Sequence, residues 1–175
     1  MENKKINVLI SEEQIEKRVA ELGKEISKEF EGKNLYVLSL LRGSFIFAAD
    51  LVRHISIPTK IGFMTTSSYG HAEESTGTVK VVNDIPDNIE GYDVLVVDDI
   101  VDTGITMEYV MKHVESLGAA SVSCAVLLDK PERRRVDLKP DFCCFEIPDV
   151  FVVGYGLNYG DHFRNIPYVF NWEDK

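Results

Sequence analysis

The sequence predicts an α/β domain in which helices flank a mostly parallel central sheet. Short apolar runs rich in β-branched residues, such as 35–41, 94–97 and 121–128, have the pattern of strands covered on both faces in a parallel sheet. Between these runs, apolar residues recur every three or four positions, which is typical of amphipathic helices. The length suits a single domain spanning residues 1–175, and we expect both chain ends to form a small hood lobe over the carboxyl edge of the sheet.

The first elements predicted from the N-terminus are a short strand at residues 6–10 and a long helix. Ser11 and Gln14 have the spacing of a capping box, which satisfies backbone N–H groups where a helix begins. Apolar residues then recur at helical spacing from 15 to 30, and Gly32 is a suitable end signal. This helix is predicted to be scaffold.

A strand-to-helix turn follows the buried strand at 35–41. Arg42 and Gly43 stand at this turn, before an apolar-faced helix at 45–55. A cation followed by glycine can present both a side-chain charge and backbone N–H groups to an anion. Taken by itself, however, the short stretch is better explained as a surface arginine beside a turn glycine.

A long polar loop is predicted at residues 67–77, between strands at 60–66 and 78–82. Long loops in compact domains are either disordered or cover a functional site. A reaction that passes through a water-sensitive cation would need such a cover.

The stretch best suited to chemistry is 94–110, which passes from a buried strand into a helix. Asp98 and Asp99 lie at the carboxyl end of this strand, and Gly104 precedes the helix. A helix N-terminus beside a glycine offers unpaired N–H groups to a phosphate. Because carboxylates repel phosphate, the two acids point to ribose hydroxyls or Mg²⁺ as intermediaries. The alternative is that the acids solvate a strand end, with Thr103 as the N-cap of the helix.

Further polar and aromatic residues follow the later strands. Lys130 comes after the strand at 121–128, at the edge where open parallel sheets bind ligands, although a lysine there is ordinarily solvated. The arginine run at 133–135 is predicted to be a solvated surface. After another strand at 141–147, Phe151 could stack on a flat heterocycle, but on the residues alone a place in the core is favoured.

The amino-acid composition limits the classes of binding partner and the cellular location that we expect. The net charge of -10 argues against broad electrostatic binding to nucleic acid. No run of 18 apolar residues and no leader segment marks the chain for a membrane or for secretion, so we expect a cytoplasmic protein. Cys124, Cys143 and Cys144 lie in apolar runs without the paired spacing of a zinc site, which predicts small core residues in a reducing compartment.

The segment DDIVDTGIT at residues 98–106 resembles the phosphoribosyl pyrophosphate signature of the type I phosphoribosyltransferases. Its surroundings, most convincingly from 40 to 164, resemble the hypoxanthine-guanine phosphoribosyltransferases. The resemblance implies the fold of that family, with phosphoribosyl pyrophosphate and a 6-oxopurine, hypoxanthine or guanine, as substrates. It also implies Mg²⁺ as cofactor and a homodimer or homotetramer as the assembly.

The resemblance further implies a role for each residue that matches the family. The phosphoribosyl group would be bound by Asp98, Asp99, Thr103, Gly104, Ile105 and Thr106, with Asp98 and Asp99 also as metal ligands. Pyrophosphate would be bound by Arg42, Gly43, Ser68, Tyr69 and Arg164, and the purine by Lys130, Phe151, Val152 and Asn158. Asp102, the acid nearest the phosphate-binding segment, is the candidate general base for the purine N7 proton.

Asn158 is the clearest departure from the family, which usually has aspartate at this position. The aspartate contributes there to a second metal site and to the purine pocket. A neutral amide is a poorer ligand for Mg²⁺, so the second metal and the preference among purines are open.

Two other classes of function deserve comparison. A phosphorelay receiver domain also has paired acids at strand ends, but these would be expected near its start, whereas 93 residues precede Val94 here. An RNA-binding regulator could share the predicted fold, since one fold hosts many functions. The acidic net charge and the combination of Lys130 with Phe151 argue against the regulator.

Overall fold

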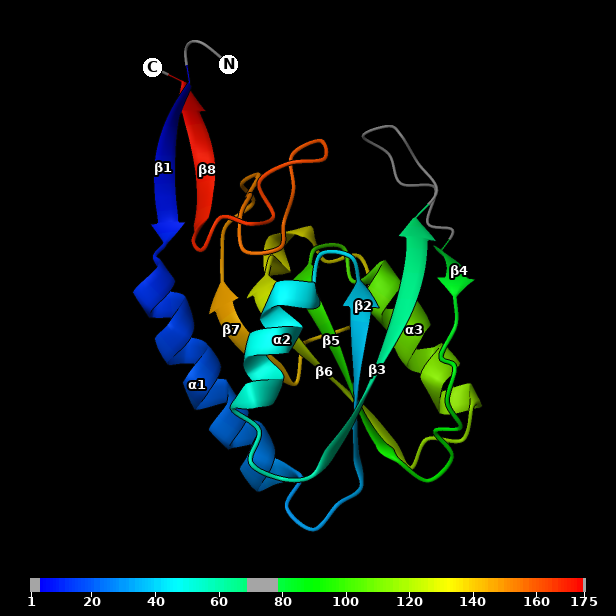
Figure 1. Ribbon diagram of the computed structural model, residues 1–175. Helices are drawn as coiled ribbons and strands as arrows, with labels where there is room; N and C mark the ends of the chain where they lie inside the picture. Colours follow the sequence, from blue (N-terminus) through cyan, green and yellow to red (C-terminus); the bar gives the residue numbers. More distant parts are fainter. Residues whose placement is uncertain (1–3, 69–78, 175) are drawn as a thin grey trace.

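The computed structural model describes residues 4–68 and 79–174, and its centre is a six-stranded sheet with the order β4-β3-β2-β5-β6-β7 (Figure 1). Its elements are β1 (Lys4–Ile10), α1 (Glu12–Glu29), β2 (Leu35–Leu41), α2 (Phe45–Arg53), β3 (Thr59–Ser68), β4 (Val79–Asn83), β5 (Asp93–Val101), α3 (Ile105–Ser116), β6 (Ser121–Asp129), the 3₁₀ helix η1 (Pro131–Arg133), β7 (Phe142–Glu146) and β8 (Val169–Asp174). Strands β3, β2, β5, β6 and β7 run parallel to one another, whereas the edge strand β4 is antiparallel to β3. The predicted mostly parallel sheet with flanking helices is therefore confirmed.

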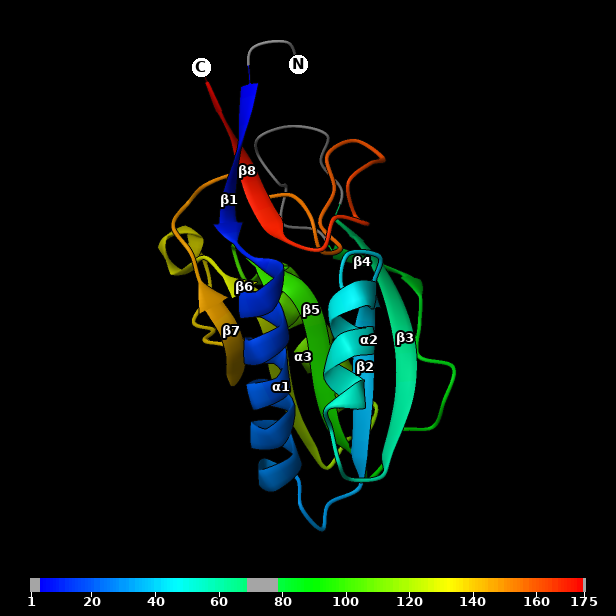
Figure 2. The same cartoon turned by 60° about the vertical axis from the view of Figure 1, so that its left-hand side comes forward.

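Helices cover both faces of this sheet, with α1 and α2 on one side and α3 on the other (Figures 1 and 2). Alternate residues of β2 enter the two cores: Leu35 and Val37 pack on the side of α1 and α2, while Tyr36 and Leu38 pack on the side of α3. A strand covered on both faces has no polar side, which explains the uninterrupted apolar run.

The central strand β5 is longer than its apolar run predicted. It continues past Val97 to Val101, so the two acids lie on the strand and not after it. Pairing with β2 ends at Ser39 and Val97, whereas pairing with β6 continues to Val101 and Asp129. Asp98 and Asp99 therefore occupy the part of β5 that has lost β2 as a neighbour.

The two ends of the chain meet in a separate antiparallel pair of strands, β1 and β8. Both ribbon views place this pair beyond the carboxyl end of the central strands, beside the segment that connects β7 to β8 (Figures 1 and 2). The predicted strand at 6–10 is thus part of β1, whereas no pattern in the sequence had indicated β8.

The helices follow their sequence signals closely. The capping box of α1 is confirmed: the Gln14 N–H donates to Ser11 Oγ at 3.3 Å, and the Ser11 N–H donates to Gln14 Oε1 at 2.8 Å. Helix α2 ends at Arg53, two residues earlier than predicted. No helix in the described part of the chain has the length and apolar character needed to cross a membrane.

Candidate active site

The two acids of β5 are partly buried side by side at the carboxyl edge. The Asp99 N–H donates to Asp98 Oδ1 at 2.9 Å, and the Ile100 N–H donates to Asp99 Oδ1 at 2.8 Å. Burial, and then repulsion from Asp99, raise the pKa of Asp98 well above its ordinary value. Burial also raises the pKa of Asp99, against the opposing charge of Arg164. Two carboxylates in such surroundings favour a cation or hydroxyl donors beside them.

The turn after β2 lies directly against these acids. A Cβ atom on Gly43 would overlap the carboxylate of Asp99, so any larger residue at this position would require that carboxylate to move. The peptide bond between Leu41 and Arg42 is cis, and the side chain of Arg42 is exposed. Ser44, which sequence reasoning did not single out, is buried and shares a 2.7 Å hydrogen bond with the hydroxyl of Ser39. The predicted anion-binding turn thus adjoins the acids.

The C-terminal segment at residues 156–164 also contacts this turn. Gly156 has φ +100, and a Cβ atom there would overlap the carbonyl oxygen of Gly43. The Gly156 N–H donates to the Arg164 carbonyl at 2.9 Å, and Arg164 Nη1 donates to the Gly156 carbonyl at 2.6 Å. Arg164, which is 122 residues from Arg42 in sequence, is therefore fixed beside the same turn.

The loop from Asp102 to Thr106 begins helix α3. Gly104 is the N-cap with φ +83, and the Ile105 N–H donates to Thr103 Oγ1 at 3.4 Å. The loop lines a hollow of about 130 Å³ whose wall consists of Asp98, Ile100, Val101, Asp102, Thr103, Gly104, Thr106 and Met107. The predicted phosphate-binding residues thus surround one small concavity together with an acid of β5.

Lys130 lies at the end of the neighbouring strand β6 and is buried, not solvated, with 7% of its surface exposed. Its Nζ lies 3.7 Å from Asp149 Oδ1, and its backbone N–H donates to the Val101 carbonyl at 2.9 Å. A buried ammonium group on a residue whose backbone adjoins the end of β5 can donate to the acceptor of a ligand bound at this edge of the sheet.

Phe151 is 60% exposed, so a place in the core is excluded. Its ring meets Tyr159 edge to face at a centroid distance of 6.0 Å, and Tyr159 in turn contacts Trp172 of β8. Val152 is buried beside it. The exposed aromatic ring is thus supported from the C-terminal strand, which suits stacking against a flat ligand.

Asn158 uses its amide to close the turn that contains Tyr159. Its Nδ2 donates to the carbonyl of Gly160, a contact that a carboxylate cannot make because it has no proton to donate. The amide at this position therefore has a structural use in this chain.

We expect Asn158→Asp to destabilise the protein by about 0.5–1.5 kcal/mol, because the hydrogen bond to the Gly160 carbonyl is lost and two oxygens would then face each other. Thermal unfolding at neutral pH without Mg²⁺ measures this, with roughly 2–4 °C lost per kcal/mol. Asn165→Asp, at an exposed site of the same segment, is the matched control. An unchanged melting temperature for Asn158→Asp would contradict the assigned hydrogen bond.

The arginine run is only in part the solvated surface that the sequence predicted, because Arg133 and Arg135 are exposed whereas Arg134 is mostly buried. Arg133 Nε lies 2.8 Å from Asp102 Oδ1, and Arg133 Nη1 lies 3.5 Å from Asp149 Oδ2. Arg134 is mostly buried and pairs with Asp129, whereas Arg135 is exposed. Arg133 and Arg134 had been missed because charge alone does not distinguish a solvated arginine from one that pairs with distant acids.

Part of the predicted pyrophosphate site lies outside the described residues. Tyr69 and the rest of the predicted polar loop up to residue 77 belong to this part, as does residue 78, which was predicted to begin the next strand. Ser68 is the last residue of β3, and the strands on either side of the loop pair in antiparallel fashion.

The described side chains at this edge of the sheet supply only part of a metal site. Within residues 4–68 and 79–174, no group of three or more His, Cys, Asp or Glu side chains could hold a metal ion. Asp98 and Asp99 supply two carboxylates, which suits Mg²⁺ because this ion is usually bound by one or two carboxylates together with substrate phosphates. The pair therefore fits a metal that arrives with a phosphorylated substrate.

Comparisons with known proteins agree with this geometry. The hypoxanthine-guanine phosphoribosyltransferase of Bacillus subtilis (strain 168) is 44% identical over 162 residues, which cover 93% of this chain and 90% of the relative. The hypoxanthine phosphoribosyltransferase of Haemophilus influenzae is 46% identical over 172 residues, or 97% of this chain and 96% of the relative. A solved hypoxanthine phosphoribosyltransferase from Staphylococcus aureus superposes with a TM-score of 0.92 at 40% identity, covering 95% of this chain and 91% of that one.

A family match also covers most of the chain. Residues 9–160 match the family described as the phosphoribosyl transferase domain. This match excludes the receiver-domain alternative, because a receiver is a different family with a different arrangement of acids. The chain belongs to the phosphoribosyltransferase family, and its relatives within it are hypoxanthine and hypoxanthine-guanine phosphoribosyltransferases.

Proposed function

We propose that this protein is a purine-salvage enzyme that transfers the 5-phosphoribosyl group from phosphoribosyl pyrophosphate to hypoxanthine, guanine or both. The products are IMP or GMP and pyrophosphate. The names of its relatives support this activity. The main support is the hollow lined by residues of the segment 98–107 at this edge of the sheet. Further support comes from the buried Lys130, whose backbone N–H donates to the Val101 carbonyl and whose Nζ lies 3.7 Å from Asp149, two residues before the exposed Phe151.

Charge development assigns the proposed roles. As the bond from C1 of the ribose to pyrophosphate lengthens, the sugar becomes cationic and the leaving group gains negative charge. Arg42 and Arg164 would offset the charge of the leaving group, with Gly43 presenting backbone and with Ser68 and Tyr69 as further contacts implied by the resemblance. Asp98 and Asp99 would hold the ribose hydroxyls and favour the cationic sugar.

The purine side needs a donor, a stacking surface and a base. Lys130 would donate to the 6-oxo group, Phe151 would stack on the ring, and the main chain of Val152 would contact its edge. Asn158 would line the same pocket. Asp102 would accept the N7 proton as the purine attacks C1.

Mg²⁺ is the proposed cofactor, with Asp98 and Asp99 as its protein ligands. When bound, the ion supplies positive charge against the pyrophosphate oxygens. The adjacent carboxylates support this choice: after burial, repulsion from Asp99 raises the pKa of Asp98, and a neighbouring cation would offset that repulsion.

We further propose that the β1–β8 pair and the segment before β8 act as the hood over this site. Phe151 and Tyr159 from that segment support this, since their rings contact each other and then Trp172 of β8. A homodimer or homotetramer is also proposed, supported by exposed apolar side chains at Phe45, Ile61 and Phe63.

The proposed location is the cytoplasm. All three cysteines are free thiols, which suits a reducing compartment. Burial raises the pKa of Cys124 and of Cys144 to about 12, so both are inert core residues.

A spectrophotometric assay tests the proposed activity directly. Hypoxanthine, guanine and xanthine are each mixed with phosphoribosyl pyrophosphate, Mg²⁺ and enzyme, and formation of the nucleotide is followed. We expect turnover of hypoxanthine, guanine or both. Lack of reaction with every base, accompanied by RNA binding that weakens steeply with salt, would favour the regulator instead.

Replacing Lys130 with methionine is expected to weaken purine binding selectively. Losing a charged hydrogen bond costs about 1.5–3 kcal/mol, so the KM for hypoxanthine should rise at least about tenfold while that for phosphoribosyl pyrophosphate changes little. Steady-state kinetics with each substrate varied in turn measures this difference. Lys139→Met, at an exposed position, serves as the control, and equal changes for both substrates in Lys130→Met would count against the assigned contact.

A further inference from the structure

Two consecutive carbonyl groups of the loop at residues 102–106 accept hydrogen bonds from the arginine run at residues 133–135. Arg134 Nη1 donates to the Asp102 carbonyl at 3.0 Å, and the Arg135 N–H donates to the Thr103 carbonyl at 2.9 Å. In a planar trans peptide the C=O and the following N–H point in opposite directions. The N–H groups of Thr103 and Gly104 must therefore point away from the arginine run.

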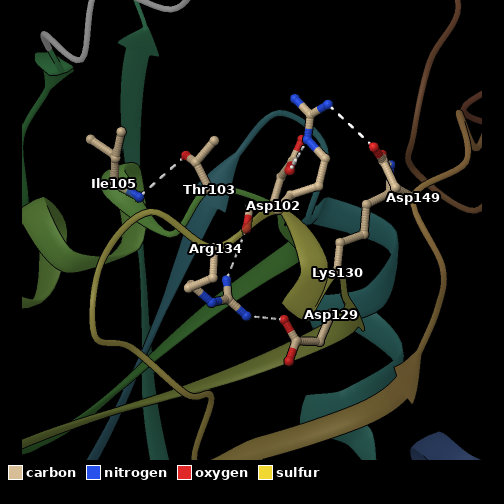
Figure 3. Close-up of polar contacts among 8 residues, drawn as sticks. Asp102, Thr103, Ile105, Asp129, Lys130, Arg134 and Asp149 are labelled. Carbon is tan, nitrogen blue, oxygen red and sulfur yellow. Dashed lines mark hydrogen bonds and ion pairs between the residues drawn. The ribbon is translucent and has the colours of Figure 1, made fainter.

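The guanidinium of Arg134 also reaches a second partner. Its Nη2 donates to Asp129 Oδ1 at the end of β6, so one side chain connects the loop after β5 to the strand that leads to Lys130 (Figure 3). The side chains of Arg134 and Asp129 are only 13% and 9% exposed. This is a buried ion pair, which requires good geometry to offset the loss of hydration.

The aliphatic part of the Arg134 side chain also packs against the loop. A Cβ atom on Gly104 would lie 2.9 Å from Arg134 Cδ and 2.8 Å from Val136 Cγ2. Glycine is required at position 104 both by its φ of +83 and by this underlying layer. Arg134 therefore packs against the loop at Gly104. The hollow of about 130 Å³ is lined by residues of the loop, and Arg134 is not among its lining residues.

The shape of the arginine side chain is what permits this double contact. A guanidinium is a rigid planar fork with several donors, whereas the ammonium of lysine is a single point. Donors fixed in advance toward an anion avoid the reorganisation that a mobile loop would undergo on binding. Holding two successive carbonyls in place is a direct way of fixing the N–H groups on the opposite side.

We propose that Arg134 is a positioning residue for phosphoribosyl transfer. By binding the Asp102 carbonyl and Asp129 together, it holds the loop at residues 102–106 in the conformation that accepts the 5′-phosphate. The inference rests on the proposed function, because the 5′-phosphate is the ligand that this function brings to the loop. Arg134 itself does not touch the substrate.

The test compares three variants of the full chain. Arg134→Lys keeps the charge but loses the fork. The double variant Arg134→Gln with Asp129→Asn removes both charges and leaves no buried carboxylate unpaired. Arg135→Ala is the matched control, because it removes an exposed cation of the same run while its backbone N–H remains. Calorimetry gives the Kd for phosphoribosyl pyrophosphate with Mg²⁺, kinetics gives both KM values, and thermal unfolding reports on the fold.

In Arg134→Lys and in the double variant, we expect the Kd and KM for phosphoribosyl pyrophosphate to rise about tenfold, the effect of one lost hydrogen bond. The KM for hypoxanthine should change less than about threefold, and Arg135→Ala should match the wild type. Wild-type affinity for phosphoribosyl pyrophosphate in both folded variants would overturn the positioning role of Arg134 but not the proposed function. If the affinities for both substrates fall together, in step with a lower melting temperature, Arg134 has only a structural role and the inference is overturned too. If the wild type does not bind phosphoribosyl pyrophosphate, both the proposed function and the positioning role of Arg134 are wrong.

Discussion

Asp102→Asn should lower kcat by about 10²–10⁴-fold, the usual contribution of a positioned general base. The amide has nearly the same shape as the carboxylate but cannot accept the N7 proton. The carbonyl of Asp102, which accepts from Arg134 Nη1, is unchanged by this substitution, so the loop should keep its conformation and the affinity for IMP should change less than about threefold. Single-turnover kinetics and calorimetry with IMP measure the two quantities.

The ion pair between Asp102 and Arg133 offers a sharp control for this result. Arg133→Gln breaks the same 2.8 Å contact but leaves the carboxylate in place. Arg133 is 42% exposed on its side chain, so we expect only a small effect on stability from this change. If Arg133→Gln lowers kcat as much as Asp102→Asn does, the loss comes from the broken ion pair and not from proton transfer.

Gly156→Ala is the second change for which we expect a large effect. The backbone at Gly156 has φ +100, which an L side chain rarely adopts, and the new Cβ would overlap the carbonyl oxygen of Gly43. The turn after β2 would have to move, and with it the proposed contacts to pyrophosphate. Since a displacement of about 1 Å can cost about 10²-fold in rate, we expect a loss of that order in kcat/KM for phosphoribosyl pyrophosphate.

Gly160→Ala separates this overlap from backbone strain. Gly160 also has a positive φ, of +57, but no heavy atom lies within 4 Å of the added Cβ. We expect this control to lose some stability and to keep most of its activity. Wild-type kcat/KM in Gly156→Ala would show that the turn tolerates the displacement and would contradict the importance given to its contact with residue 156.

Elements formed by local patterns could be predicted with good accuracy. The capping box at Ser11 and the apolar runs of β2 and β6 concern residues that are neighbours in sequence, so propensity and periodicity identify them. Strand β8 escaped prediction because its formation depends on pairing with β1 at the other end of the chain. The extension of β5 to Val101 likewise depends on β6 continuing beside it after β2 has turned away.

The sequence by itself determined the alternation of strands and helices and the acid-rich loop at residues 98–106, because each is encoded within a short stretch. Only the tertiary structure decided which side chains surround that loop. It exposed Phe151, buried Lys130, and placed Arg134 under Gly104. The physical reason is that burial and pairing depend on contacts between segments far apart in the chain, and a charged or aromatic residue has the same appearance in sequence whether such a contact exists or not.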